Sequence, residues 1–360
     1  MPGIISEPQA FAQLCADLAG QGHIGLDTEF MRERTYFAQL CLLQLCFADR
    51  AVCVDTLALT DMSALAGAMG AMATRKILHA ARQDLEVLWP ITGALNGVFD
   101  TQVAAALVGL PAQIGYADLT QTLLGRSLHK SQTRTDWSRR PLSVAQIDYA
   151  LDDVRYLPEL AERLTQRLIE LGRERWFDEE MAELNSGQSY QVAPEEAWRR
   201  LKGLNELDES RLALARALAA WREQRAIHAD RPRAWIMPDA ALREIVSTVP
   251  RSIDQLAALA ELPEGIRRHS GEQILALIGS VALPPRLPPL TARRRPDPAE
   301  AETVRRLSQL TREVGQELGI APEILATRRD MERLVAGDRQ GGPLQGWRRA
   351  VIGERLLQAL

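Results

Sequence analysis

The stretch His23-Ile24-Gly25-Leu26-Asp27-Thr28-Glu29-Phe30 decides the fold that this sequence predicts. Apolar and polar side chains alternate along it, which is the pattern of a β-strand with one buried face. Every second residue from Ile24 to Phe30 lies on one face, so Asp27 and Glu29 leave the other face together. Two carboxylates side by side offer a platform for a divalent cation. Taken alone the pair is weak support, because acidic residues end many strands.

Further strand and helix patterns surround this stretch. A helix is expected at 8–19, strands at 40–47, 51–55, 76–79 and 98–100, and helical stretches at 61–73 and 84–89. Consecutive strands followed by alternating helices and strands predict an α/β fold with a mixed sheet flanked by helices. A long helix is expected from about 143 to 170, with Ser143 and Gln146 as its capping box and a break at Pro158, after Leu157.

Two composition breaks divide the 360 residues, which exceed the usual size of one core. The first break is the small polar stretch 185–190, and the second is the proline-rich stretch from Leu283 to Pro298. The expected domains are therefore 1–188, 192–283 and 300–360, with a proline- and arginine-rich linker at 284–299. Amphipathic helical patterns dominate after residue 192, so the last two domains are expected to be all-α.

The formal net charge of −4 argues against attraction of the whole chain to nucleic acid, so such binding would use local basic patches. Two patches exist. One consists of Lys130, Arg134, Arg139 and Arg140 interleaved with Trp137, and the other is the run of three arginines at 293–295. A charge cluster is more often a solvated face than a binding site.

Several kinds of protein are disfavoured by the sequence. The chain shows neither a signal peptide nor eighteen consecutive uncharged apolar residues, so we expect a cytoplasmic protein with no membrane partner. Its four cysteines lack the paired spacing of a zinc site, and they are expected to be buried small apolar residues.

Two more acidic positions could join Asp27 and Glu29. Asp84 follows the strand ending at His79 and stands at a helix start, where an aspartate usually caps the helix. Tyr149 and Asp153 are four residues apart and share one face of the long helix. Asp100, which ends another predicted strand, is expected to be a helix cap. His79 could contact a phosphate or be satisfied inside the fold.

In this order and on these elements, the four carboxylates and Tyr149 resemble the DEDD exonuclease superfamily in its tyrosine-bearing branch. Residues 35–45 and 130–143 look like the ribonuclease D versions of the motifs around them. Residues 198–203, 221–222 and 231–236 resemble the helicase-and-ribonuclease-D C-terminal (HRDC) domain. Residues 319–323 and 346–353 look like a second, more divergent HRDC copy.

This resemblance implies a ribonuclease H-like first domain followed by two HRDC domains. It implies a 3′-5′ exoribonuclease that releases 5′-mononucleotides with two divalent ions. Asp27 would bridge both ions, Glu29 and Asp153 would complete one, and Asp84 would act on the other mostly through water. Oxygen ligands favour Mg²⁺ or Mn²⁺ over zinc. Since a phenol of pKa about 10 is a poor base at neutral pH, Tyr149 is expected to orient the attacking water.

The expected partner is RNA, in particular a transfer-RNA precursor with a 3′ extension, and the expected state is a monomer. RNA contacts are assigned to the following residues: His79, Lys130, Arg134, Trp137, Arg139 and Arg140. Two alternatives stay open. A DNA 3′-5′ exonuclease could share the carboxylate set, although the sequence has no helicase motor or Walker A motif. A non-catalytic nucleic-acid-binding scaffold would normally have lost some of the metal ligands.

Overall fold

The chain divides into two compact units. The computed structural model describes residues 4–70, 73–128, 135–186, 190, 193–204, 207–282 and 297–360. The first unit, here called the sheet unit, is formed by Met1–Met31, Leu40–Tyr190 and Pro296–Leu360. The second, here called the helical unit, is formed by Arg32–Gln39 and Gln191–Arg295.

A mixed sheet lies at the centre of the sheet unit, as the sequence predicts. Its strands are β1 (Ile4–Ile5), β2 (His23–Met31), β3 (Gln39–Phe47), β4 (Arg50–Asp55), β5 (Arg75–Leu78) and β6 (Val98–Asp100). In the described residues they form one six-stranded sheet in the order β1-β4-β3-β2-β5-β6. β3 and β4 are antiparallel, whereas β2, β5 and β6 pair in parallel, with Gly25 opposite Ile77. The two-residue β1 is too short for its pattern to be recognised in the sequence.

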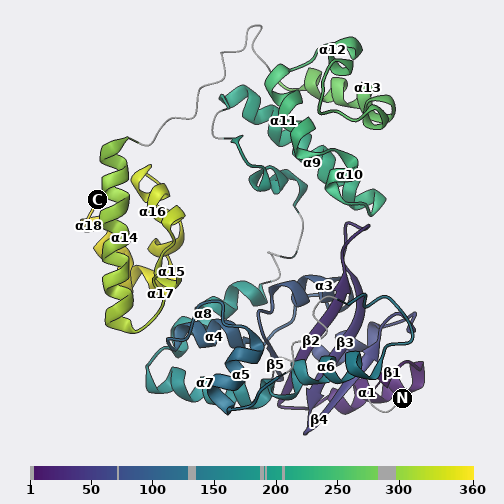
Figure 1. The fold of residues 1–360 in the computed structure, drawn as a ribbon, viewed down its shortest axis with the longest axis vertical. Helices are drawn as coiled ribbons and strands as arrows, with labels where there is room; N and C mark the ends of the chain where they lie inside the picture. The colour runs from purple at the N-terminus through teal and green to yellow at the C-terminus, as the bar shows by residue number, and fades with distance from the viewer. Residues whose placement is uncertain are drawn as a thin grey trace. The chain divides into compact units, whose positions relative to one another are not determined.

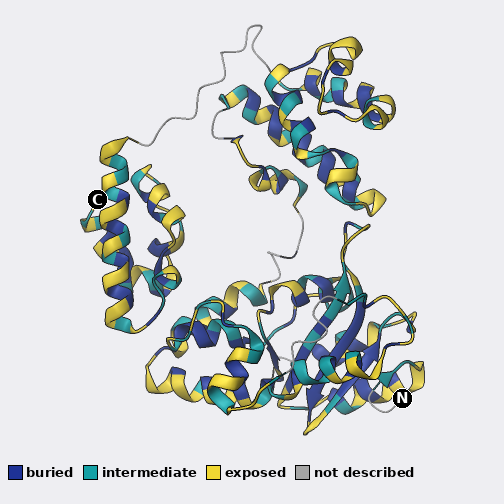
Figure 2. Cartoon of the chain, in the orientation of Figure 1, coloured by how far each residue is buried: buried dark blue, intermediate teal, exposed yellow. Residues whose placement is uncertain are grey.

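Helices cover both faces of this sheet (Figures 1 and 2). One face packs against α1 (Pro8–Leu18), α2 (Ser63–Met69) and α3 (Arg82–Thr92). The other packs against α4 (Thr101–Leu107), α5 (Tyr116–Leu124), α6 (Val144–Arg155), α7 (Leu157–Glu170) and α8 (Glu174–Asn185). Ile24 and Leu26 are fully buried against the first group, so Asp27 and Glu29 face the second.

The long helix predicted at 143–170 is interrupted earlier than expected. Its capping box of Ser143 and Gln146 is present. However, α6 ends at Arg155 and α7 begins at Leu157, so the break precedes Leu157 and does not follow it. Pro158 lies in the first turn of α7, where its missing N–H costs nothing, whereas inside a continuous helix its ring would clash with the carbonyl of residue 154.

The last segment of the chain packs within the sheet unit. It contains α14 (Pro298–Leu318), α15 (Pro322–Leu325), α16 (Arg328–Val335), α17 (Gly346–Arg348) and α18 (Glu354–Gln358). Trp347 stacks on Trp176 of α8 with ring centroids 4.4 Å apart, and its indole N–H donates to Glu180 at 2.8 Å. The described residues of this segment therefore share a core with α4 and α8, which the linker composition did not indicate.

The helical unit has its own core. A 3₁₀ turn (Pro194–Arg200) precedes α9 (Glu209–Ala229), α10 (Arg233–Ile236), α11 (Asp239–Thr248), α12 (Ile253–Ala257) and α13 (Glu264–Ser280). Leucine and isoleucine side chains from α9, α11 and α13 are buried together. This unit also includes the described turn 32–39, which joins β2 to β3. In the described parts of the chain, every helix is too short or too polar to cross a membrane.

Candidate active site

Three of the predicted carboxylates come together on the helix-covered face of β2. Asp27, Glu29 and Asp153 each offer an oxygen atom that lies within 4.8 Å of the other two. β2 supplies the first two, and α6, which packs across this strand, supplies Asp153. The strand periodicity of two and the helix position of Asp153 thus produce one acidic cluster.

The fourth carboxylate lies beside this cluster and outside the group of three. Asp84 is in the first turn of α3, and Ala81, not Asp84, occupies the position before that helix. Its Oδ1 accepts a hydrogen bond of 2.5 Å from the Thr28 hydroxyl. Thr28 stands between the two acidic residues of β2 and is a site residue that the sequence analysis missed. The hydroxyl between two carboxylates was the only available signal.

Burial and mutual repulsion dominate the electrostatics of these four groups. Burial raises the pKa of Asp27 well above its ordinary range, and the charges of Asp84, Asp153 and Glu29 raise it further. Burial and the charges of Asp153 and Asp84 raise the pKa of Glu29 to about 8. The cluster therefore resists carrying its full negative charge at neutral pH.

The other two carboxylates shift in the same direction. Burial raises the pKa of Asp84 to about 7, although the hydrogen bond from Thr28 opposes the shift. Burial likewise raises the pKa of Asp153 to about 7, against the opposing hydrogen bond from Tyr149. A partly buried set of repelling carboxylates is the environment that a divalent cation stabilises, since the cation reverses the local charge balance.

Tyr149 lies where the sequence predicts, one turn before Asp153. Its phenol hydrogen bonds to the Asp153 carboxylate, and its ring centroid is 6.1 Å from that of Trp137. Burial and the charges of Asp153 and Glu29 raise its pKa above its usual value. The phenol consequently keeps its proton at neutral pH and can only donate or accept hydrogen bonds.

The donor set of the cluster fits a hard cation. Carboxylate oxygens are the ligands that Mg²⁺ and Mn²⁺ prefer, and neither a thiol nor an imidazole belongs to this group of described residues. A hollow of about 640 Å³ is lined by Thr28, Phe30, His79 and Asp84 among other residues, so of the four carboxylates only Asp84 lines it. That volume lies within the range of small-molecule sites.

His79 has partners for both ring nitrogens. Nδ1 lies 2.9 Å from the Thr101 hydroxyl, and Nε2 lies 2.9 Å from the backbone carbonyl of Ile114. Of the two readings left open by the sequence, this geometry favours a histidine satisfied inside the fold. Asp100 is a helix cap as expected, since its side chain accepts from the backbone N–H groups of Gln102 and Val103.

The predicted RNA-contacting residues are placed very differently. Trp137 is buried, and Arg140 donates to both carboxylate oxygens of Asp55 at 2.7 Å, so the structure favours a structural role for both. Arg139 is 84% exposed and pairs with Asp136 at 3.0 Å. Lys130 and Arg134 lie outside the described residues, as does the arginine run 293–295.

Comparisons with known proteins identify the family of this chain. Residues 2–169 match the family model of a 3′-5′ exonuclease, and residues 211–278 match that of the HRDC domain. Ribonuclease D of Nitrobacter hamburgensis is 37% identical over 359 residues, covering 98% of this chain and 94% of the relative. Ribonuclease D of Granulibacter bethesdensis is 38% identical, covering 99% and 92%.

The chain belongs to the ribonuclease D family. The crystal structure of Escherichia coli RNase D, titled an exoribonuclease involved in structured RNA processing, matches with a TM-score of 0.87 and 31% identity. That match covers 99% of this chain and 98% of the other. The exonuclease fold and the HRDC domain predicted from the sequence are confirmed, and the chain is a 3′-5′ exoribonuclease.

Proposed function

We propose that Asp27, Glu29, Asp84 and Asp153 hold two divalent ions, Mg²⁺ or Mn²⁺, for hydrolysis of the last phosphodiester of an RNA. The observation that carries this proposal is the group of three carboxylates whose oxygens lie within 4.8 Å of one another. When bound, the ions would offset the charge of the phosphate and lower the pKa of the attacking water. Asp27, Glu29 and Asp153 would hold one ion, and Asp84 would serve the other, partly through water.

Tyr149 orients the attacking water in this proposal. Its raised pKa keeps the phenol protonated, so it does not serve as the general base. Its hydrogen bond to Asp153 and the packing of Trp137 fix the direction of the ring. Tyr149→Phe is expected to cripple turnover and to leave RNA binding largely intact. Unchanged turnover would reject this role.

Release of 5′-mononucleotides from a 3′-extended transfer RNA, with Mg²⁺ or Mn²⁺, tests the site. Asp27→Asn should abolish metal-dependent release. Asp61→Asn is the matched control, because Asp61 is an exposed carboxylate of the same unit, whose partner is the neighbouring Ser63 amide. Equal release by wild type and Asp27→Asn would overturn the assignment. No release by either protein would favour the scaffold alternative.

The substrate is proposed to be a transfer-RNA precursor, processed by a cytoplasmic monomer. A folded body with a short 3′ tail suits a chain in which one part hydrolyses and another part binds. The HRDC domain would contact the body, and residues 300–360 would be a second, divergent copy. Turnover is compared on matched RNA and DNA 3′ tails, each attached to the same duplex. This comparison distinguishes the proposal from the DNA exonuclease alternative. Faster turnover on DNA would favour that alternative.

A further inference from the structure

The end of α6 leaves backbone carbonyl groups that need partners. In a continuous helix, the carbonyl of residue 152 would accept from the amide of residue 156. The helix stops at Arg155, and α7 starts at Leu157 with Pro158 in its first turn. Apart from the Val154 carbonyl, which accepts from the Tyr156 amide, the last carbonyls of α6 must therefore be satisfied by other elements. Asp153 lies in this last turn, so whatever fixes the turn also fixes a carboxylate of the site.

The Tyr116 hydroxyl, from the first residue of α5, is inserted into this break. It donates to the carbonyl of Asp152 at 3.1 Å, and it accepts from the amide of Tyr156 at 3.1 Å. One side-chain oxygen thus replaces the direct hydrogen bond between residues 152 and 156. Insertion of a side chain into the helical ladder is a known cause of sharp helix kinks.

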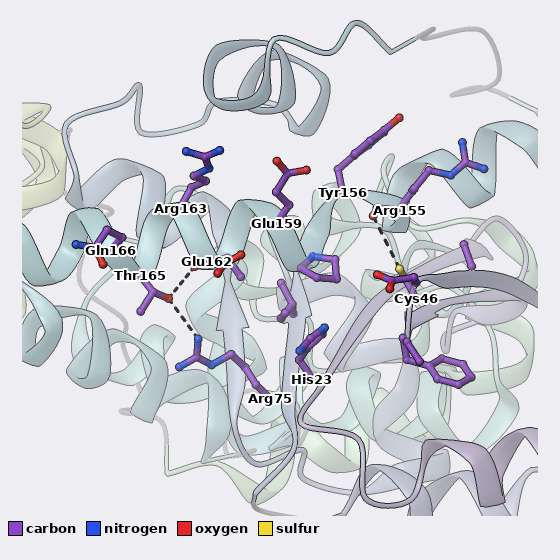
Figure 3. Close-up of a pocket in the computed structure, with 17 residues that line it drawn as sticks. His23, Cys46, Arg75, Arg155, Tyr156, Glu159, Glu162, Arg163, Thr165 and Gln166 are labelled. Carbon is purple, nitrogen blue, oxygen red and sulfur yellow. Dashed lines mark hydrogen bonds between the residues drawn. The ribbon is translucent and has the colours of Figure 1, made fainter.

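Two neighbouring backbone carbonyls at the end of α6, those of Val154 and Arg155, lie against strands of the sheet. The Cys46 thiol lies 3.8 Å from the carbonyl of Arg155, as the dashed line in Figure 3 shows. The carbonyl of Val154 faces Gly25 of β2, where an added Cβ would lie only 3.2 Å from it. Glycine at this position therefore lets the end of α6 approach β2 closely, two residues before Asp27.

Tyr116 is itself held in place by neighbouring side chains. The ring of His79 packs edge-on against it, with centroids 5.7 Å apart. His79 Nε2 and the Gln102 side-chain amide both contact the carbonyl of Ile114, at 2.9 Å and 3.0 Å, just before Tyr116. Burial, together with the nearby charges of Asp153 and Asp27, raises the pKa of the phenol, so it stays a proton donor.

We propose that Tyr116 is a positioning residue for the metal centre. Its hydroxyl fixes where α6 breaks and thereby holds the Asp153 carboxylate against those of Asp27 and Glu29. Without it, the carbonyl of Asp152 and the amide of Tyr156 would bond directly, and the last turn of α6 would tighten. Asp153 would then move away from the other two ligands. This inference rests on the proposed assignment of Asp153 as a metal ligand.

The test measures Mn²⁺ binding directly, by electron paramagnetic resonance of free Mn²⁺ titrated with the full-length protein. Tyr116→Phe removes only the hydroxyl. Thr120→Val is the matched control, since Thr120 is buried on the same helix and its hydroxyl donates to the Tyr116 carbonyl at 2.8 Å. Asp153→Asn tests the underlying assignment. Thermal unfolding of each metal-free variant reports stability independently.

Tyr116→Phe should weaken Mn²⁺ binding about 10- to 100-fold, the usual effect of removing a group that orients a ligand. Thr120→Val should lower the unfolding temperature comparably and leave Mn²⁺ affinity unchanged. Gly25→Ala, which presses on the same break from β2, should weaken Mn²⁺ binding as Tyr116→Phe does. Wild-type affinity in folded Tyr116→Phe, or equal weakening in Thr120→Val, would overturn the proposal. Unchanged binding by Asp153→Asn would overturn the ligand assignment instead.

Discussion

Two clusters of charged side chains, one in each unit, show opposite electrostatic designs. In the sheet unit, Asp27, Glu29 and Asp153 repel one another, and burial raises the pKa of each. In the helical unit, Glu223 is fully buried, and Arg233 donates to its two oxygens at 2.5 Å and 2.6 Å. Its charge is thus matched by a cation that the chain itself supplies.

The neighbours of Glu223 complete the contrast. The Tyr36 hydroxyl donates to Glu223, and Arg200 lies 3.5 Å from the same carboxylate. Although burial raises the pKa of Glu223, these hydrogen bonds and charges hold it below its ordinary value. Removing one partner from a paired cluster destabilises the fold, whereas an unpaired cluster lowers stability until a ligand with positive charge binds. This difference separates a structural cluster from a functional one.

Asp27→Asn should have the largest effect on the difference between the two clusters. Loss of a metal ligand is expected to remove about 4 kcal/mol of transition-state stabilisation, roughly a 10³-fold fall in turnover. The same change should raise the unfolding temperature of the metal-free protein above pH 8, because the amide cannot acquire the repelling charge that the carboxylate gains once its raised pKa is passed. Single-turnover kinetics and thermal unfolding in EDTA measure the two effects. A variant that loses both activity and stability would contradict the functional reading of the cluster.

The pH dependence of stability should also differ between the clusters. Glu29, with a pKa raised to about 8, and Asp84 and Asp153, raised to about 7, bind protons more tightly when folded than when unfolded. Their contribution is fully present below the unfolded pKa values and is lost as the pH rises towards 8. The metal-free protein should therefore lose stability between about pH 4 and pH 8, on the order of several kcal/mol.

Urea unfolding of the sheet unit in EDTA, measured across this pH range, tests the expectation. Saturating Mn²⁺ should flatten or reverse the slope, since the cation favours ionised ligands. Glu223 has the opposite sign, because its depressed pKa supplies stability that is lost as the pH falls through it. A gain in stability of the metal-free sheet unit between pH 5 and pH 8 would show that ionisation of these carboxylates does not destabilise the folded state.

Local patterns predicted one half of the site better than the other. Alternation along 23–30 placed Asp27 and Glu29 on one face, and the helical spacing of Tyr149 and Asp153 placed both at the cluster. Such periodicities are local properties of the chain. The hydrogen bond from Thr28 to Asp84 joins residues 56 positions apart, and no local pattern encodes it.

The burial of Trp137 and the position of the helix break also depend on contacts between residues far apart in the sequence. Trp137 stands among charged residues in sequence and looks exposed, yet it is buried with Leu142 and Ile147 against β3 and β4. The break in the long helix depends on Tyr116, which lies 40 residues before Tyr156. Proline identified the region of the break, but a distant hydroxyl helps set its position. Long-range partners of this kind require the fold.

Glu223→Gln tests the cluster of the helical unit, in which the carboxylate is paired with arginine. Removing the charge leaves Arg233 without its buried partner, and breaking such pairs usually costs about 3–5 kcal/mol. Arg233 is 35% exposed, so we expect a smaller loss of about 2–3 kcal/mol. Urea unfolding of the helical unit measures it, with Glu264→Gln as the control because that carboxylate is 84% exposed. Turnover of a short single-stranded RNA should be unchanged, and a large loss of turnover would contradict a purely structural role.

Trp235→Ala tests whether α10, which begins at the Arg233 that pairs with Glu223, contributes to RNA binding. Glu223 anchors Arg233 at the start of α10, and Trp235, two residues later, is 56% exposed and follows the exposed Arg231 by four positions. An exposed aromatic ring next to arginines can stack on an RNA base, a contact of about 1–3 kcal/mol. We therefore expect Trp235→Ala to weaken RNA binding about tenfold at fixed salt, measured by fluorescence anisotropy, with stability unchanged. Ile253→Ala removes another exposed apolar side chain of the same unit and should leave binding unchanged. Equal losses in both variants would mean that the region near α10 has no special part in binding, and Glu223 would then stabilise the fold alone.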